Sequence, residues 1–128
     1  MRCYGIRGAT TVEHNTKESI LSASKELLQQ MIAANGVDTE DIAVIWFTAT
    51  NDLTAEFPAA AAREMGMVKT ALMCGHEMNV PGSLPQCLRI MMLVNTEKKK
   101  DDIAYVYIKG AEVLRSEFSP LRTGDDMP

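Results

Sequence analysis

The chain has 128 residues and lacks several features that mark specialised classes of protein. No apolar run approaches the ~20 residues of a membrane-spanning helix, so we expect no membrane partner. The three cysteines, Cys3, Cys74 and Cys87, form an odd set with no Cys-x-x-Cys pair. Such a set indicates reduced thiols and not a disulfide framework. Because the N-terminus leads directly into a predicted strand and not into a signal peptide, we expect a cytoplasmic protein.

Positive charge is also scarce. Thirteen Lys and Arg stand against seventeen Asp and Glu, which gives a formal net charge of -4. The only cluster of like positive charge is Lys98-Lys99-Lys100, and Asp101-Asp102 follows it directly. This arrangement is typical of a solvated loop. Since a basic face is missing, we expect no nucleic-acid partner, and an anionic ligand would need arginines gathered locally.

The common cofactor signatures are missing as well. There is no phosphate-loop glycine pattern, and Gly5-Ile6-Arg7-Gly8 is not a dinucleotide-binding fingerprint. The segment Cys74-Gly75-His76-Glu77 offers too few ligands for a metal, and no second cluster completes a tetrahedral set. A Cys/His nucleophile pair is no better supported, because adjacency in sequence does not create hydrogen-bonding geometry. We therefore expect no metal and no cofactor.

The remaining composition is that of an ordinary globular domain. The hydrophobic fraction is 46% and the charged fraction 23%, whereas aromatic residues make up only 5%. Aliphatic side chains and nine methionines must therefore fill the core. The length fits one domain, which we assign to residues 1–115. Residues 116–128 hold few core residues and are predicted to form a mobile C-terminal tail.

The first half of the domain carries clear local signals. Residues 1–8 contain strand formers, and the glycines at 5 and 8 predict a close backbone approach or a sharp turn. Asn15, followed by Glu18 at the third helical position, predicts a helix start. Asn35-Gly36 predicts its end. The apolar residues between them fall mainly on one helical stripe: Ile20, Leu21, Leu27, Leu28, Met31 and Ile32.

The second half alternates strands with one short helix. The apolar, β-rich run Ile42–Thr50 predicts a strand buried on both faces. Pro58 begins a short helix over residues 59–65. Further strands are predicted at residues 70–74 and 87–94, and residues 103–109 and 111–114 together supply the last strand. The order β-α-β-α-β-β-β predicts an α+β fold, a mixed β-sheet with one long and one short helix packed on it. That topology alone fits many functions.

Three arginines lie within or just after predicted strands, and Arg89 is the most informative of them. It lies inside the apolar run CLRIMMLV, where a charge is costly unless it is paired or lines a cavity. Arg89 either reaches solvent from a strand edge or points its fork into an anion-binding pocket. Arg7 and Arg115 leave the same choice open between a surface position and a site.

Several ordered motifs resemble the small, non-helical class of chorismate mutases. The resemblance runs from about residue 3 to residue 115. It rests on Arg-Gly-Ala-Thr-Thr-Val-Glu at 7–13, Phe57-Pro58-Ala59 with Arg63-Glu64, Cys74-x-x-Glu77-Met78, Cys87-x-Arg89-x-Met91-Met92, Val106-Tyr107 and Val113-Leu114-Arg115. It implies an isomerase that converts chorismate to prephenate in phenylalanine and tyrosine biosynthesis without a cofactor. It also implies a homotrimer that forms a pseudo-α/β barrel, with active sites between subunits.

The resemblance also implies roles for individual residues. Arg7 and Arg89 would bind the substrate's carboxylates and ether oxygen. Glu77 and Cys74 would contact its ring hydroxyl, and Tyr107 would hold the enolpyruvyl side chain. Arg89, Glu77 and Arg7 would form the catalytic set.

A second set of residues would complete the substrate site. Phe57, Ala59 and Arg63 would come from the adjacent subunit, and Arg115 would close the site beside the tail. Met73 belongs to the substrate-binding set, although the family pattern has a small polar residue there.

Two other functions fit a trimer of similar fold. One is an enamine/imine deaminase, which also places an arginine in an intersubunit cleft. The other is a non-catalytic trimer that binds a metabolite carboxylate. The block Cys74-x-x-Glu77 and the motif around Arg7 favour the mutase over the deaminase. The opposite charges of Arg89 and Glu77 suit a charge-separating reaction better than a plain anion site.

Overall fold

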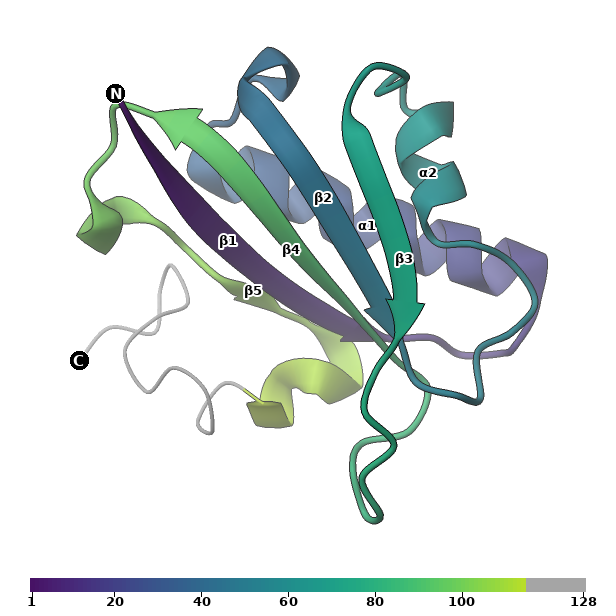
Figure 1. Cartoon of the computed structure of the whole chain (residues 1–128). Helices are drawn as coiled ribbons and strands as arrows, with labels where there is room; N and C mark the ends of the chain where they lie inside the picture. The colour runs from purple at the N-terminus through teal and green to yellow at the C-terminus, as the bar shows by residue number, and fades with distance from the viewer. Residues whose placement is uncertain (115–128) are drawn as a thin grey trace.

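The structure, a computed structural model, describes residues 1–114; the predicted tail at 116–128 lies outside the described residues. Five strands form one sheet in the order β3-β2-β4-β1-β5 (Figure 1). Their bounds are β1 Arg2–Thr11, β2 Ile42–Ala49, β3 Ala71–His76, β4 Cys87–Thr96 and β5 Val106–Tyr107. Antiparallel pairs join β4 to β1 and β2, while β3 and β5 pair in parallel with β2 and β1. The predicted mixed sheet is confirmed.

Within residues 1–114, two α-helices accompany the sheet, α1 (Lys17–Asn35) and α2 (Ala59–Glu64). Figure 1 shows α1 crossing behind the sheet, with α2 beside β3. Shorter 3-10 turns are η1 (Thr39–Asp41), η2 (Lys100–Asp102) and η3 (Lys109–Leu114). We call the face of the sheet turned away from α1 the open face; it points toward the viewer in Figure 1. The predicted α+β class, with one long and one short helix, is confirmed.

The long helix begins one residue later than predicted. Thr16, not Asn15, is the N-cap, and its hydroxyl oxygen accepts a hydrogen bond from the Ser19 backbone N–H at 3.1 Å. The Asn15 side-chain oxygen instead accepts backbone N–H groups of Thr54 and Ala55, at 2.8 and 3.0 Å. Sequence spacing could not separate these two neighbouring cap residues. The helix ends as predicted, since Gly36 takes left-handed backbone with φ 58°.

The core lies between the sheet and α1. Ile45 and Phe47 of β2 and Leu27 and Met31 of α1 are fully buried in it. Burial along β2 alternates, however, because Trp46 and its open-face neighbours keep partial exposure. The prediction that β2 is buried on both faces is therefore wrong for the described residues of a single chain, in which the α-helices pack on one face of the sheet and leave β2 partly exposed on the other.

Gly8 allows the helix to approach the sheet closely. A Cβ built at this position would lie 2.5 Å from the Met31 sulfur and 3.1 Å from a Leu27 methyl carbon. Since real Cβ atoms do not approach other heavy atoms that closely, only glycine fits here without displacement of α1. The predicted close backbone approach is confirmed at Gly8.

The C-terminal part of the described chain holds less strand than predicted. Only Val106 and Tyr107 pair in the sheet, in parallel with β1. Lys109 then adopts φ 53°, which turns the chain out of the strand. Residues 111–114 continue as the 3-10 turn η3, so the predicted strand there is wrong. Ala111 and Leu114 are buried because they pack with Ala9 and Tyr107 over part of the open face.

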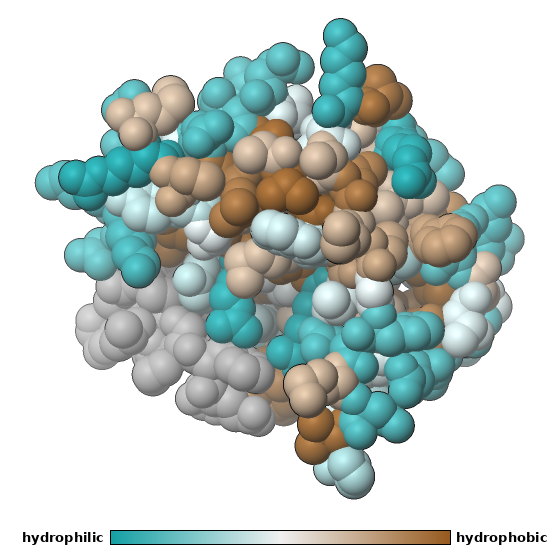
Figure 2. Space-filling model, viewed as in Figure 1, coloured by the Kyte–Doolittle hydropathy of each residue, from teal (hydrophilic) through white to brown (hydrophobic). Residues whose placement is uncertain are grey.

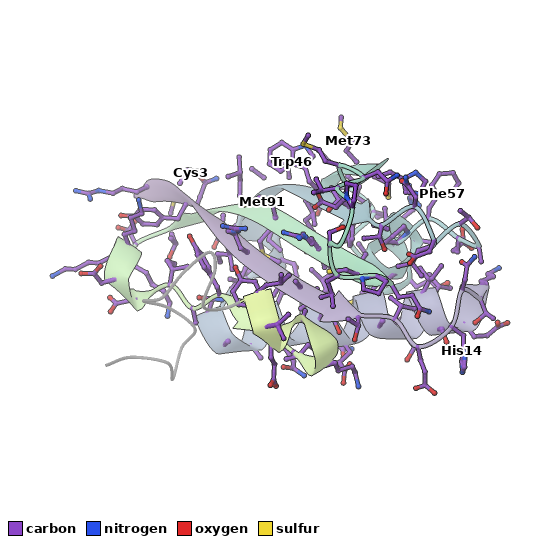
Figure 3. The ribbon with its side chains drawn as sticks, turned by 90° about the horizontal axis from the view of Figure 1, so that it is seen from below. Cys3, His14, Trp46, Phe57, Met73 and Met91 are labelled. Carbon is purple, nitrogen blue, oxygen red and sulfur yellow. The ribbon has the colours of Figure 1, made fainter. Side chains whose placement is uncertain are left out.

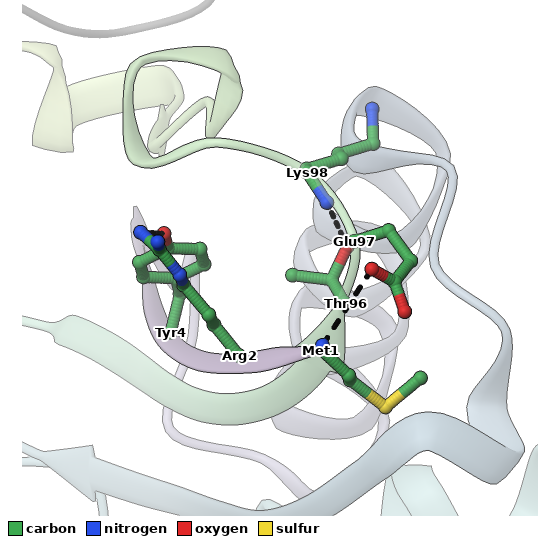
Figure 4. Close-up of polar contacts among 6 residues, drawn as sticks. All are labelled: Met1, Arg2, Tyr4, Thr96, Glu97 and Lys98. Carbon is green, nitrogen blue, oxygen red and sulfur yellow. Dashed lines mark hydrogen bonds and ion pairs between the residues drawn. The ribbon is translucent and has the colours of Figure 1, made fainter.

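The lysine cluster lies at the end of the sheet where β1 begins and β4 finishes. Lys98, Lys99 and Lys100 are all exposed, which confirms the prediction of a solvated loop. Figure 4 shows the contacts there: the Met1 amino group pairs with Glu97 at 3.6 Å, and the Lys98 backbone N–H donates to Thr96 Oγ1 at 3.1 Å. Within residues 1–114, neither helix has the length and apolar character needed to cross a membrane.

Candidate active site

A hollow of about 340 Å³ on the open face brings together residues that are distant in sequence. It draws on β1, β2, β4 and β5 and on the residue that follows β3. The lining residues are Arg7, Gly8, Ala9, Trp46, Thr48, Glu77, Arg89, Ile90, Met91 and Tyr107. Four of them, Arg7, Glu77, Arg89 and Tyr107, were predicted from the sequence as site residues.

Strand register explains why these side chains converge. Arg89 lies opposite Ala9 on β1 and opposite Thr48 on β2, while Tyr107 lies beside the same Ala9. Side chains alternate between the two faces of a strand, so residues in register share a face. Arg7, two positions before Ala9, therefore points to the same face.

Arg89 and Glu77 form the charged centre of the hollow. The Arg89 Nε lies 3.3 Å from Glu77 Oε2, and the two side chains keep 27% and 28% of their exposure. Strand β4 lies between β2 and β1, so Arg89 is not at a sheet edge. Arg89 therefore lines the hollow and does not reach solvent from an edge of the sheet. An arginine in such a position can meet an anionic ligand with several N–H donors in one plane.

Thr48 holds the carboxylate of Glu77 in place, and sequence analysis missed it. Its hydroxyl donates to Glu77 Oε2 at 2.6 Å, and the Glu77 backbone N–H donates to the Ala49 carbonyl at 2.9 Å. A signal was available, because Thr48 is a polar residue inside the apolar run of β2. Only the tertiary structure, however, relates it to Glu77.

Tyr107 brings a buried phenol to the hollow. The side chain is 3% exposed, and its hydroxyl oxygen has no hydrogen-bond partner among the described residues. Burial raises the pKa of Tyr107, although the nearby Arg7 charge opposes the shift. The phenol is therefore neutral and can donate a hydrogen bond. Arg7 is half-buried beside it, with its guanidinium carbon 6.0 Å from the centre of the Tyr105 ring.

The structure places Cys74 on the opposite face from this hollow. Cys74 of β3 pairs with the buried Phe47 of β2, so the Cys74 side chain points to the helix side of the sheet. Burial raises the pKa of the Cys74 thiol, while a hydrogen bond from the Ala59 backbone and the Arg63 charge oppose the shift. Ala59 is buried, Arg63 is exposed, and Phe57 keeps 69% of its exposure.

Phe57 and Cys74 border a second hollow, of about 370 Å³, at the β3 edge, and Ala59 and Arg63 belong to α2, which packs on β3. The hollow is lined by Ala49, Leu53, Thr54, Ala55, Glu56, Phe57, Pro58, Cys74, Gly75 and His76. One chain thus divides the predicted site residues into two groups. The open-face group is Arg7, Glu77, Arg89 and Tyr107, and the β3-edge group is Phe57, Ala59, Arg63 and Cys74.

Met73 stands between the two groups, and Arg115 lies outside the described residues. Met73 of β3 pairs with Trp46 of β2 and is 61% exposed on the open face. Figure 3 shows Met73, Trp46 and Met91 on the side of the sheet away from α1, and Figure 2 shows apolar side chains gathered across this face. The open face therefore combines a charged hollow with an apolar border.

The segment Cys74-Gly75-His76-Glu77 does not converge on one point. Cys74 and His76 share the helix side, where His76 Nε2 lies 3.4 Å from the Leu53 carbonyl oxygen, whereas Glu77 meets Arg89. Among residues 1–114, no three His, Cys, Asp or Glu side chains are close enough to hold a metal ion.

The fold and the open-face hollow define a class: a small α+β protein whose sheet carries a hollow lined by two arginines and a glutamate. Comparison with known proteins is more specific. The sequence profile of the family described as Chorismate mutase type I matches residues 3–118. The chain therefore belongs to the chorismate mutase type I family, and it is an enzyme of the isomerase class.

Individual relatives agree with this assignment. The chain is 46% identical over 114 residues to Chorismate mutase AroH of Thermus thermophilus, covering 88% of this chain and 93% of the relative. It is 44% identical over 120 residues to Chorismate mutase AroH of Bacillus subtilis, and the match covers 93% of this chain and 94% of the relative. A solved chorismate mutase from Clostridium thermocellum superposes with a TM-score of 0.86 at 54% identity, covering 87% of this chain and 99% of that one. The predicted family is confirmed, and the deaminase and binding alternatives lose their support.

Proposed function

We propose that the open-face hollow is the place where this enzyme rearranges chorismate to prephenate. The observation that carries this proposal is the Arg89–Glu77 pair at 3.3 Å, beside Arg7 and the buried hydroxyl of Tyr107. Chorismate is a dianion, so a protein of net charge -4 needs arginines placed together to bind it. The hollow supplies two arginines on neighbouring strands.

The rearrangement itself needs no nucleophile. The ether C–O bond breaks while a C–C bond forms within the same molecule, and no proton is transferred. Partial negative charge develops on the ether oxygen and partial positive charge on the ring. Arg89 stabilises the oxygen and Glu77 the ring, and both are preorganised, so little reorganisation is needed at the transition state. Thr48 keeps the Glu77 carboxylate oriented through its 2.6 Å hydrogen bond.

Arg7 and Tyr107 bind the enolpyruvyl carboxylate. A buried hydroxyl without a partner is costly, and a ligand oxygen that accepts its proton removes that cost. Tyr107 meets this description among the described residues. The half-buried guanidinium of Arg7 provides the charge for the same carboxylate.

A second copy of the chain completes the site in a homotrimer. In one chain the β3-edge group faces away from the open-face group, so a single subunit offers only part of the predicted contacts. The open face exposes Met73 and, in part, Trp46 and Met91, and such apolar area is typical of a subunit interface. A head-to-tail contact that closes after three copies lets the edge of one subunit cover the open face of the next, as in a pseudo-α/β barrel.

A mixing experiment tests the shared site. Arg89→Ala removes a group from the open face, and Arg63→Ala removes one from the β3 edge. Refolding an equal mixture of the two variants forms intact sites wherever an unmodified open face meets an unmodified edge, which is about a quarter of all interfaces in a closed ring. We expect activity near that level and a trimer mass in sedimentation. Activity no greater than the sum of the separate variants would place both groups of residues in one subunit.

The enzyme works in the cytoplasm. Cys3 is exposed, Cys74 half-buried and Cys87 buried, and none of the three pairs with another cysteine in the structure. Free thiols of this kind persist in a reducing compartment.

The activity is tested by following chorismate loss with purified protein, in the presence and absence of a chelator. We expect rapid turnover that the chelator does not change, with prephenate confirmed by acid conversion to phenylpyruvate. A folded protein that binds chorismate but forms no prephenate would contradict the proposed function.

A further inference from the structure

The residue before β4 has an unusual backbone conformation. Gln86 adopts φ 48°, the left-handed region that non-glycine residues rarely occupy. Such a conformation costs on the order of 1 kcal/mol and persists only when surrounding contacts hold it. Gln86 lies three positions before Arg89, at the end of the loop that joins β3 to β4 beyond the lower edge of the sheet (Figure 1).

Contacts from two other segments hold Gln86 in place. Its backbone N–H donates to Asp52 Oδ2 at 2.9 Å. Its carbonyl accepts the Val12 N–H at 2.8 Å, and its side-chain Nε2 donates to the Glu13 carbonyl at 3.3 Å. The turn is therefore fixed between the end of β1 and the segment that follows β2.

Asp52 reaches the first residue of β4 as well. Its other carboxylate oxygen accepts the Thr50 hydroxyl proton at 2.5 Å, and the same hydroxyl oxygen accepts the Cys87 N–H at 3.0 Å. The Thr50 N–H in turn donates to the Cys87 carbonyl at 3.0 Å. The hydrogen bond from Thr50 keeps the pKa of Asp52 below its usual value, so the carboxylate is ionised at neutral pH and accepts both bonds.

This network joins the two strands that carry the charged centre. Thr48, two residues before Thr50, orients Glu77. Arg89, two residues after Cys87, pairs with Glu77 and lies in register with Thr48. Because Cys87 and Arg89 lie two residues apart on β4, we expect a displacement of Cys87 relative to Thr50 to change the Arg89–Glu77 distance.

We infer that Asp52 is a positioning residue of the active site, which fixes the start of β4 so that Arg89 is held against Glu77. Asp52 itself is exposed and does not line the open-face hollow. The inference rests on the proposed function of that hollow. It predicts an unusual result for an exposed carboxylate, since substitutions at such positions commonly have little effect.

The test compares Asp52→Ala with Asp52→Asn and with a matched control. Asp38→Ala is the control, because Asp38 is also exposed and caps one backbone N–H, that of Glu40 at 3.0 Å, before β2 begins. We expect Asp52→Ala to lower kcat/KM for chorismate roughly tenfold, chiefly through kcat, since a hydrogen bond to a charged group is lost. Asp52→Asn keeps an acceptor for Gln86 and a donor for Thr50, so it should remain within about threefold of the parent.

A double-variant cycle separates positioning from general destabilisation. If Asp52 acts through Arg89, Asp52→Ala lowers kcat/KM by much less than tenfold in an Arg89→Lys background, because the arginine that Asp52 positions has already been replaced. If Asp52→Ala does not fold, Thr50→Val, which breaks the link to Cys87, takes its place in the same cycle. An equal loss in both backgrounds, or activity of the folded variant within twofold of the parent, would overturn the inference. Absence of turnover in the parent enzyme would instead refute the proposed function.

Discussion

Arg89→Lys is the most demanding test of the proposed chemistry. Lysine keeps the positive charge but replaces a planar fork of donors by a single ammonium group on a flexible stem. The Nε atom that lies 3.3 Å from Glu77 is lost, and with it the fixed direction of the remaining donors toward a ligand. Loss of one preorganised donor to developing negative charge typically lowers turnover by ~10²–10³, about 2.7–4 kcal/mol of transition-state stabilisation. We therefore expect kcat to fall by that factor.

The folded state should tolerate this substitution. Arg89 keeps 27% of its exposure, and Glu77 retains the hydrogen bond from Thr48, so no buried carboxylate is left without a partner. A partly exposed ion pair is worth about 1 kcal/mol or less, so the unfolding midpoint should change little. Chorismate loss and urea unfolding are measured for this variant and for Arg2→Lys, an exposed arginine at the far end of β1. Turnover within a few-fold of the parent would refute the role assigned to Arg89.

Three further predictions follow from the described contacts. Tyr107→Phe should raise KM about tenfold without lowering the unfolding midpoint, since the buried hydroxyl has no described protein partner to lose; a lower midpoint with unchanged KM would contradict its ligand role. Burial raises the pKa values of Cys74, Cys87 and Tyr107, so the folded state holds protons that the unfolded state releases. The unfolding free energy should therefore fall as pH rises above about 8.5, and less steeply in Cys87→Ala; a flat urea midpoint between pH 8 and 10 would count against this. Gly8→Ala should lower the free energy of unfolding in urea by about 1–3 kcal/mol, because its Cβ would lie 2.5 Å from a methionine sulfur of α1. Gly75→Ala, whose Cβ meets nothing within 4 Å, is the control.

Local patterns in the sequence predicted most of the elements. The apolar stripe and the Asn35-Gly36 end predicted α1, and the runs Ile42–Thr50 and Cys87–Val94 predicted the two longest strands after β1. These predictions succeed because helix and strand periodicity are properties of neighbouring residues. Residues 111–114 were predicted as a strand because Val113 and Leu114 are apolar, but the turn at Lys109 leads them into η3. Tertiary packing of η3 against β1 overrides that local preference.

The candidate site was predicted only in part, and for a different reason. Arg89 attracted attention because a charge in an apolar run is costly, and Glu77 and Arg7 followed from the family resemblance. Thr48 is a polar residue in an apolar run, but its role, like that of Asp52, depends on a distant partner: Glu77 is 29 residues from Thr48, and Gln86 is 34 residues from Asp52. Contacts of that kind are set by strand order and register, which single-sequence patterns do not specify.

Sequence alone predicts the α+β class, the scarcity of positive charge, the order of the elements as far as β5, and the family. Each of these depends on composition, on short-range periodicity or on motifs that are read along the chain. The tertiary structure decided that β4 is central, that Arg7, Glu77, Arg89 and Tyr107 share one face, and that Cys74 does not. The physical reason is that side chains alternate across a strand, so a residue's face depends on parity and register with partner strands and not on its neighbours in sequence.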